Sequence, residues 1–97
     1  MPNAFTEVSV ASTSYGSSPD LELDWLPNQW LFQNLEGAVT DVVYVSFDGV
    51  NDHGAVIPTI GGGTLMLPTK SKRIWLRLGG SATNPTPVNL TAFTADL

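Results

Sequence analysis

Hydrophobic and polar residues alternate in short runs along most of the chain. The alternation is clearest in residues 21–25 (Leu-Glu-Leu-Asp-Trp) and 74–78 (Ile-Trp-Leu-Arg-Leu). A period of two predicts β-strands that turn one face toward a core. Weaker runs of the same kind predict further strands at 5–10, 30–34, 42–47, 55–58, 64–68 and 88–93.

The same pattern argues against helices. No long window keeps apolar residues at helical spacing, and glycine or proline interrupts almost every candidate. About eight short strands, spaced roughly ten residues apart, predict an all-β fold. We expect a single-domain antiparallel β-sandwich, for which jelly-roll and immunoglobulin-like topologies both remain open.

A chain of 97 residues is long enough for one modest core. In this interpretation residues 1–19 form an N-terminal arm with the first strand, and residues 20–97 form the body of the same domain. Pro58 and Pro68 predict strands at sheet edges, because proline lacks the backbone N–H that a central strand donates.

Charged residues are scarce, at 13% of the chain where roughly a quarter is usual. The net charge is −5, and three of the four cations lie within residues 70–73. This basic patch is too small to predict direct nucleic-acid binding. Sparse charge fits a protein whose surface is largely occupied by partners, and small β-domains share this composition. We expect a homo-oligomer with further protein partners.

The chain contains no cysteine, which excludes a disulfide framework, a thiolate nucleophile and a cysteine-based zinc site. Its first seven residues lack the basic and apolar regions of a secretory signal. No apolar run approaches the roughly 20 residues of a membrane-spanning helix. We therefore expect synthesis in a cytoplasm, without secretion by a standard route and without membrane association.

Most groups able to do chemistry gather in residues 48–54, which include Asp48, Asn51, Asp52 and His53. Their oxygens suit calcium, but the spacing differs from that of an EF-hand loop. An Asp-Gly pair after a strand is typical of a turn whose carboxylate accepts backbone N–H groups. Adjacent Asp52 and His53 point to opposite sides of an extended chain, which argues against an acid–base pair. We expect a turn here, and neither catalytic activity nor a metal site.

Two further features bear on ligand binding. Residues 61–64 are glycine-rich but lack the lysine of a phosphate-binding loop, so they predict a hairpin connection and no cofactor. Trp25, Trp30 and Trp75 admit two interpretations, a sugar-stacking platform or side chains of a core and an interface. The second is the more common in small sandwiches.

Several large side chains are expected on strand faces that point away from the core. On a lone monomer such side chains are awkward, whereas in an assembly they are natural contacts. The candidates for contact with a partner are Trp30, Tyr44, His53, Trp75 and Arg77.

Three segments, together with the aromatic strand 30–34, resemble a known kind of protein. They are 41–49 (Asp-Val-Val-Tyr-Val-Ser-Phe-Asp-Gly), 51–54 (Asn-Asp-His-Gly) and 73–77 (Arg-Ile-Trp-Leu-Arg). The pattern is similar to that of small virion proteins of tailed bacteriophages, over roughly residues 20–95.

This resemblance implies a non-enzymatic structural role in a phage particle. It implies most specifically a capsid decoration, or cement, protein that binds the assembled shell. The expected partners are the major capsid protein or other virion proteins, and the expected location is the virion after synthesis in the bacterial cytoplasm. The alternatives are a head–tail or tail component, and a carbohydrate- or receptor-binding β-module at the tail.

Overall fold

The alternating segments fold into eight β-strands in the computed structural model, which describes residues 3–34, 42–57, 63–79 and 86–94. The strands are β1 (Asn3–Val10), β2 (Leu21–Glu22), β3 (Gln29–Asn34), β4 (Val43–Ser46), β5 (Gly54–Val56), β6 (Thr64–Leu67), β7 (Arg73–Leu78) and β8 (Thr86–Phe93). No helix in this part of the chain is long and apolar enough to cross a membrane.

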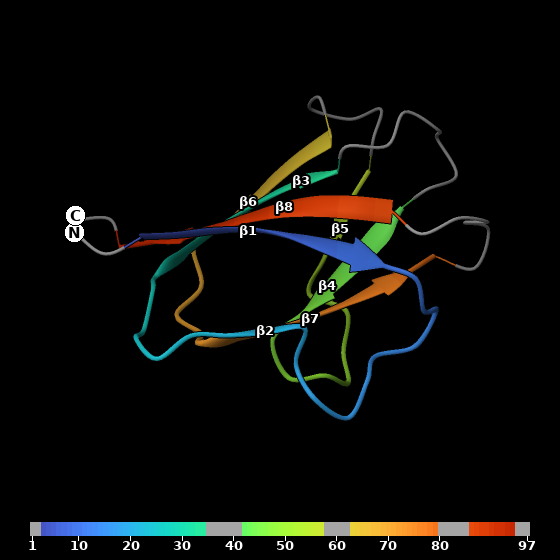
Figure 1. The fold of residues 1–97 in the computed structure, drawn as a ribbon, viewed down its shortest axis with the longest axis horizontal. Helices are drawn as coiled ribbons and strands as arrows, with labels where there is room; N and C mark the ends of the chain where they lie inside the picture. The colour runs from blue at the N-terminus through green and yellow to red at the C-terminus, as the bar shows by residue number, and fades with distance from the viewer. Residues whose placement is uncertain (1–2, 35–41, 58–62, 80–85, 95–97) are drawn as a thin grey trace.

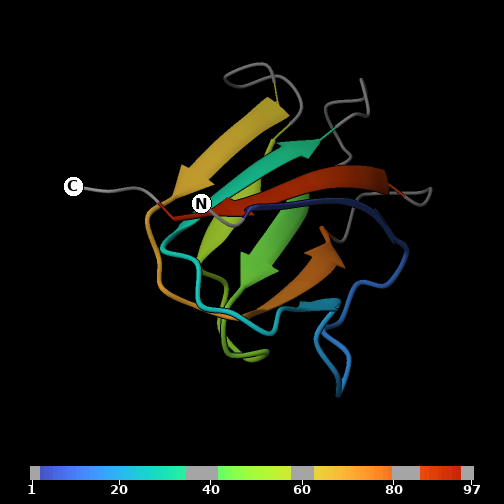
Figure 2. The ribbon, with the colours of Figure 1, turned by 60° about the vertical axis from the view of Figure 1, so that its left-hand side comes forward.

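The strands form two four-stranded antiparallel sheets, in the orders β1-β8-β3-β6 and β2-β7-β4-β5 (Figure 1, Figure 2). Strand β1 pairs with β8, β2 with β7, β3 with β6 and β4 with β5. These are the pairings of a long hairpin rolled into two sheets, which is the eight-stranded jelly roll. The predicted antiparallel sandwich is confirmed, and its topology is the jelly roll of the two alternatives.

The proline-flanked segments lie at sheet edges, as predicted. Strand β6 is the last strand of one sheet and is followed directly by Pro68. Strand β5 is the last strand of the other sheet, and Pro58 lies outside the described residues. In both sheets the long alternating strands β7 and β8 occupy interior positions, where each can donate to two neighbours.

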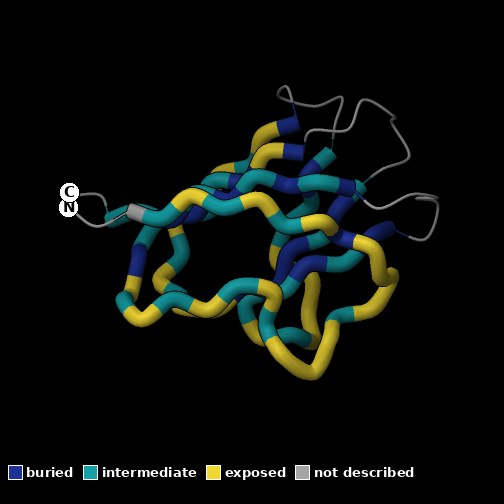
Figure 3. The backbone as a smooth tube through the Cα atoms, viewed as in Figure 1, coloured by how far each residue is buried: buried dark blue, intermediate teal, exposed yellow. Residues whose placement is uncertain are grey.

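The inward-facing rows of the two sheets meet in one hydrophobic core. Trp30 and Phe32 of β3 are its largest members, and their rings stack with centroids 6.2 Å apart. Each large side chain buried here contributes about 1.5–3 kcal/mol. Figure 3 marks the buried positions along the strands. The core consists of Val10, Trp30, Phe32, Val43, Val45, Val56, Ile74, Leu76, Leu78, Val88, Leu90 and Ala92.

Two predicted segments differ in extent from the observed strands. The run 21–25 gives only the two-residue strand β2, although the Leu23 N–H still donates to the Lys72 carbonyl at 2.8 Å. Residues 3–10 of the expected arm pair with β8 along their whole length, so they form an edge strand of the sheet. Residues 61–62 of the glycine-rich run lie outside the described residues.

Candidate functional site

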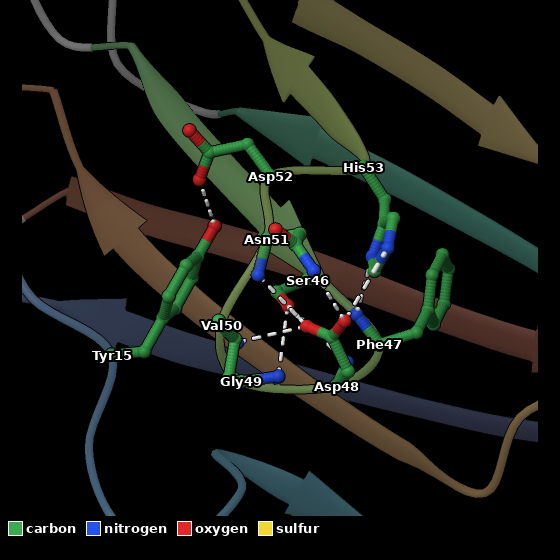
Figure 4. Close-up of polar contacts among 9 residues, drawn as sticks. All are labelled: Tyr15, Ser46, Phe47, Asp48, Gly49, Val50, Asn51, Asp52 and His53. Carbon is green, nitrogen blue, oxygen red and sulfur yellow. Dashed lines mark hydrogen bonds and ion pairs between the residues drawn. The ribbon is translucent and has the colours of Figure 1, made fainter.

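The segment after β4 is a turn held by one hydroxyl and one carboxylate (Figure 4). The Ser46 Oγ donates to Asp48 Oδ1 at 2.9 Å and accepts from the Gly49 N–H at 2.9 Å. Asp48 Oδ1 also accepts from the backbone N–H groups of Val50 and Asn51, at 2.8 and 2.9 Å. The hydrogen bonds from Asn51 and then Val50 hold the pKa of the Asp48 carboxyl well below its ordinary value. The prediction of a turn at Asp48 is confirmed.

Asp52 and His53 point away from each other, as their adjacency predicted (Figure 4). The Asp52 carboxylate accepts from the Tyr15 hydroxyl and from the Arg77 guanidinium. The His53 Nδ1 accepts from the Phe47 N–H at 2.9 Å, and the two rings stack with centroids 5.6 Å apart. Both side chains therefore stabilise local structure, and they do not form an acid–base pair.

Arg77 joins the loop before β2 to the loop after β4. Its Nη2 and Nε donate to the two Asp52 oxygens, at 2.7 and 3.1 Å. The guanidinium carbon lies 4.4 Å from the centre of the Tyr44 ring and 5.6 Å from that of Tyr15. Two of the predicted contact residues, Tyr44 and Arg77, thus contact each other within the chain.

This cluster shifts the protonation of its members. Hydrogen bonds from Arg77 and then Tyr15 lower the pKa of the Asp52 carboxyl. Burial, followed by the hydrogen bond to Asp52, raises the pKa of the Tyr15 phenol well above its ordinary value. The Asp52 hydrogen bond raises the pKa of Arg77. All three shifts favour the charge states that hold the cluster together.

The expectation that Trp30 lies on an outward face is wrong. Trp30 is fully buried, and its Nε1 donates to the Ser71 carbonyl at 3.1 Å. Residues 30–32 are all apolar, so their pattern does not reveal which phase points inward. The pairing of Trp30 with the buried Ala92 places it on the core side. A sugar platform that includes all three tryptophans is therefore excluded.

Trp75, by contrast, lies on the outer side of β7 and is half-buried. Gly49 packs against its indole, and an added Cβ there would lie only 2.9 Å from Trp75 Cε2. Trp75 is also part of the lining of a hollow of about 420 Å³. The hollow is lined by Phe47, Asp48, Ser71, Lys72, Arg73 and Trp75. Of the predicted contact residues, Trp75 alone lines this hollow.

A second surface lies on the outer face of the sheet β1-β8-β3-β6. The strand registers place Phe5 opposite Thr91, Thr91 opposite Leu31, and Leu31 opposite Met66. These four residues form one row across all four strands, which we name the outer apolar row. Phe5 is 70% exposed and Met66 is 52% exposed. Phe5 and Met66, on the two edge strands, are its exposed apolar members, and Leu31 between them is half-buried.

The phase of two apolar residues in the sequence indicates the outer apolar row. Phe5 is out of phase with Val8 and Val10, which both pack toward the core. Met66 lies between Leu65 and Leu67, which both pack against the core. An apolar residue at a position of opposite phase in a strand predicts an outward-facing hydrophobic side chain.

Neither surface has the ligands of a metal centre. In the described ranges no three His, Asp or Glu residues are grouped to hold an ion. The chain matches no known protein-family model, and no curated protein is significantly similar to it. The resemblance to phage virion proteins therefore stays a prediction.

Proposed function

We propose that this chain is a non-enzymatic structural protein of a bacteriophage particle. As a capsid decoration protein, it would bind the assembled shell through the outer apolar row. The phage particle is what the sequence resemblance implies, and the observation that carries binding to a partner is the row itself. Phe5, Leu31 and Met66 present apolar surface on one face of a rigid sheet, where contact with a partner removes it from water.

The chemistry of the face supports a protein partner. The row on one side of it runs Glu7, Asn89, Gln33 and Thr64, which are uncharged polar groups and one carboxylate, and the row on the other side pairs Phe93 with Gln29. An apolar centre with a polar rim is the usual composition of a protein interface. The complementary surface is an apolar strip with a cation or N–H donors beside it.

The loop 48–54 supports a structural role in a different way. Each of its titratable side chains already serves the fold: Asp48 closes the turn, Asp52 binds Arg77, and His53 accepts from the Phe47 N–H. A general base has to be available to a substrate proton. Groups held in this way suit a stable scaffold better than proton transfer.

A cement protein needs only modest affinity at each site. Many copies on a repeating shell bind neighbouring subunits, and bridging between them adds avidity without any new chemistry. Binding to the assembled shell alone then stabilises the assembled state by mass action. The expected homo-oligomer is, in this proposal, the array of copies on the shell.

Immunogold labelling of gradient-purified particles from cells that encode the chain tests this proposal. A decoration protein gives label over the whole shell, with many copies per particle by quantitative mass spectrometry. Label at one vertex or along a tail would instead identify a head–tail or tail component. Label at the far end of a tail would favour the receptor-binding alternative. Particles without the chain would contradict all three.

A further inference from the structure

The hollow beside Trp75 is bounded by two segments that the fold holds in place. On one side, Ser46 and Asp48 fix the turn after β4. On the other side, the buried Trp30 indole anchors the Ser71 carbonyl. The Ser71 Oγ in turn accepts from the Arg73 N–H at 3.2 Å and donates to the Arg73 carbonyl at 2.8 Å. The hollow is therefore preformed, which lowers the entropy lost on binding.

Its volume of about 420 Å³ falls in the range of small-molecule sites. Phe47 and Trp75 supply aromatic surface, and Gly49 supports the indole from the turn. Aromatic surface in a hollow with a few polar groups is the common composition of sites for ring-shaped ligands. The polar groups then decide which kind of ring fits.

Those polar groups have capacity left for a ligand. Lys72 forms no ion pair with any residue that the structure describes, and Arg73 uses Nε for Glu22. Asp48 Oδ1 accepts three hydrogen bonds. Asp48 Oδ2 accepts one within the described chain, from the Asn51 amide at 3.0 Å, and it lies 3.8 Å from His53 Nε2, which is beyond hydrogen-bond distance. A carboxylate oxygen has two acceptor positions, so Oδ2 retains one.

We propose that this hollow binds an acidic saccharide, in which a uronic-acid ring lies against Trp75 and its carboxylate is bound by Lys72 and Arg73. The C–H face of the ring matches the aromatic surface. A ring hydroxyl donates to Asp48 Oδ2, while the two cations offer donors alone. This inference does not rest on the proposed function, because it concerns a different surface from the outer apolar row.

The same groups argue against a phosphate ligand. A phosphate monoester near pH 7 carries about 1.5 to 2 negative charges, so it would place more negative charge beside Asp48, which stays ionised, than one carboxylate does. The chain also carries a net charge of −5, which opposes dense negative charge on a ligand. A uronic acid has one carboxylate and several hydroxyls. It therefore fits a site in which one acceptor, Asp48, lies beside the two cations Lys72 and Arg73.

Titration of the ¹⁵N-labelled protein at constant ionic strength tests the proposal. The probes are methyl glucuronide, methyl glucoside, acetate and adenosine monophosphate. The Trp75 indole N–H should shift saturably with the glucuronide, while the indole of Trp25, which packs against the core and does not line the hollow, serves as the internal reference. The glucoside, which lacks the carboxylate, should bind about tenfold more weakly. Acetate alone should not move the Trp75 signal.

Matched variants assign the carboxylate contact. Lys72→Ala should weaken glucuronide binding about tenfold, whereas the nearby exposed Lys70, which does not line the hollow, should tolerate alanine without loss. An unchanged Trp30 indole signal confirms that each variant is folded. The proposal is overturned by an absent Trp75 shift, by equal binding of glucuronide and glucoside, or by tighter binding of adenosine monophosphate.

Discussion

Arg77 and Asp52 form a two-point ion pair between residues 25 positions apart in the chain. Tyr44 lies directly opposite Arg77 in the register of β4 and β7, so the guanidinium lies over its ring while it binds Asp52. The Tyr15 hydroxyl donates to the same carboxylate. The sheet register thus places Arg77 where it joins the loop before β2 to the loop after β4.

The planar fork of Arg77 is expected to matter more than its charge. Arg77→Lys keeps the charge but loses the two-point contact and the stacking on Tyr44. We expect a lower midpoint of urea denaturation for Arg77→Lys and for Asp52→Asn. The double variant should lose less than the sum of the two, because both remove the same interaction. Full additivity would show that the pair does not couple the loops.

Gly49 is required by both its backbone and its neighbour. Its φ is +76°, a region that other residues enter at a cost of about 1–2 kcal/mol, and an added Cβ would collide with Trp75. Gly49→Ala should therefore lower the free energy of unfolding by at least about that amount. Gly16→Ala is the matched control, since its nearest neighbour would be 3.5 Å away. Equal stability of the two variants would contradict this assignment.

An alanine substitution at Trp30 is expected to lower the free energy of unfolding strongly. Trp30→Ala removes a fully buried ring and leaves the Ser71 carbonyl without its donor. Removal of such a core ring costs about 3–5 kcal/mol. Met66→Ala, on the outer face, should change stability by about 0.5 kcal/mol or less. Chemical denaturation measures both, and a Trp30 variant as stable as the Met66 variant would refute the core assignment.

The turn at Asp48 makes the free energy of unfolding depend on pH in the acidic range. Its carboxyl has an ordinary pKa of 3.8, and the folded turn lowers that pKa. As the pH falls through the ordinary pKa, the unfolded chain binds protons before the folded chain does. The free energy of unfolding therefore decreases below about pH 5. Urea midpoints between neutral and acidic pH should fall less steeply for Asp48→Asn than for the natural chain. If the urea midpoints fall equally steeply with pH in the variant and in the natural chain, Asp48 is not a source of the pH dependence.

Features that depend on neighbouring residues could be predicted from the sequence. Alternation located the strands, the prolines located the edges β5 and β6, and Asp48-Gly49 located the turn. Each of these depends on neighbours within a few residues. The adjacency of Asp52 and His53 sufficed, in the same way, to predict their opposite directions.

Features that depend on strand pairing could not be predicted from the sequence. The run Trp30-Leu31-Phe32 is apolar in both phases, so only its pairing with β8 decides that Leu31 faces outward. The Arg77–Asp52 pair needs the register of β4 with β7. The hollow needs two loops that the jelly roll brings together from residues 47–48 and 71–73. Long-range pairing alone distinguishes the jelly roll from an immunoglobulin-like sandwich.

In the proposed function, the outer apolar row binds the assembled shell. Purified particles from cells lacking the chain are incubated with the protein, and bound copies are counted after sedimentation. Phe5→Ser/Met66→Ser should reduce binding at least about tenfold. Leu26→Ser/Val50→Ser, at positions that are 52% and 78% exposed but off the row, should bind as the natural chain does. Undiminished binding of the row variant, with both variants folded, would contradict the claim.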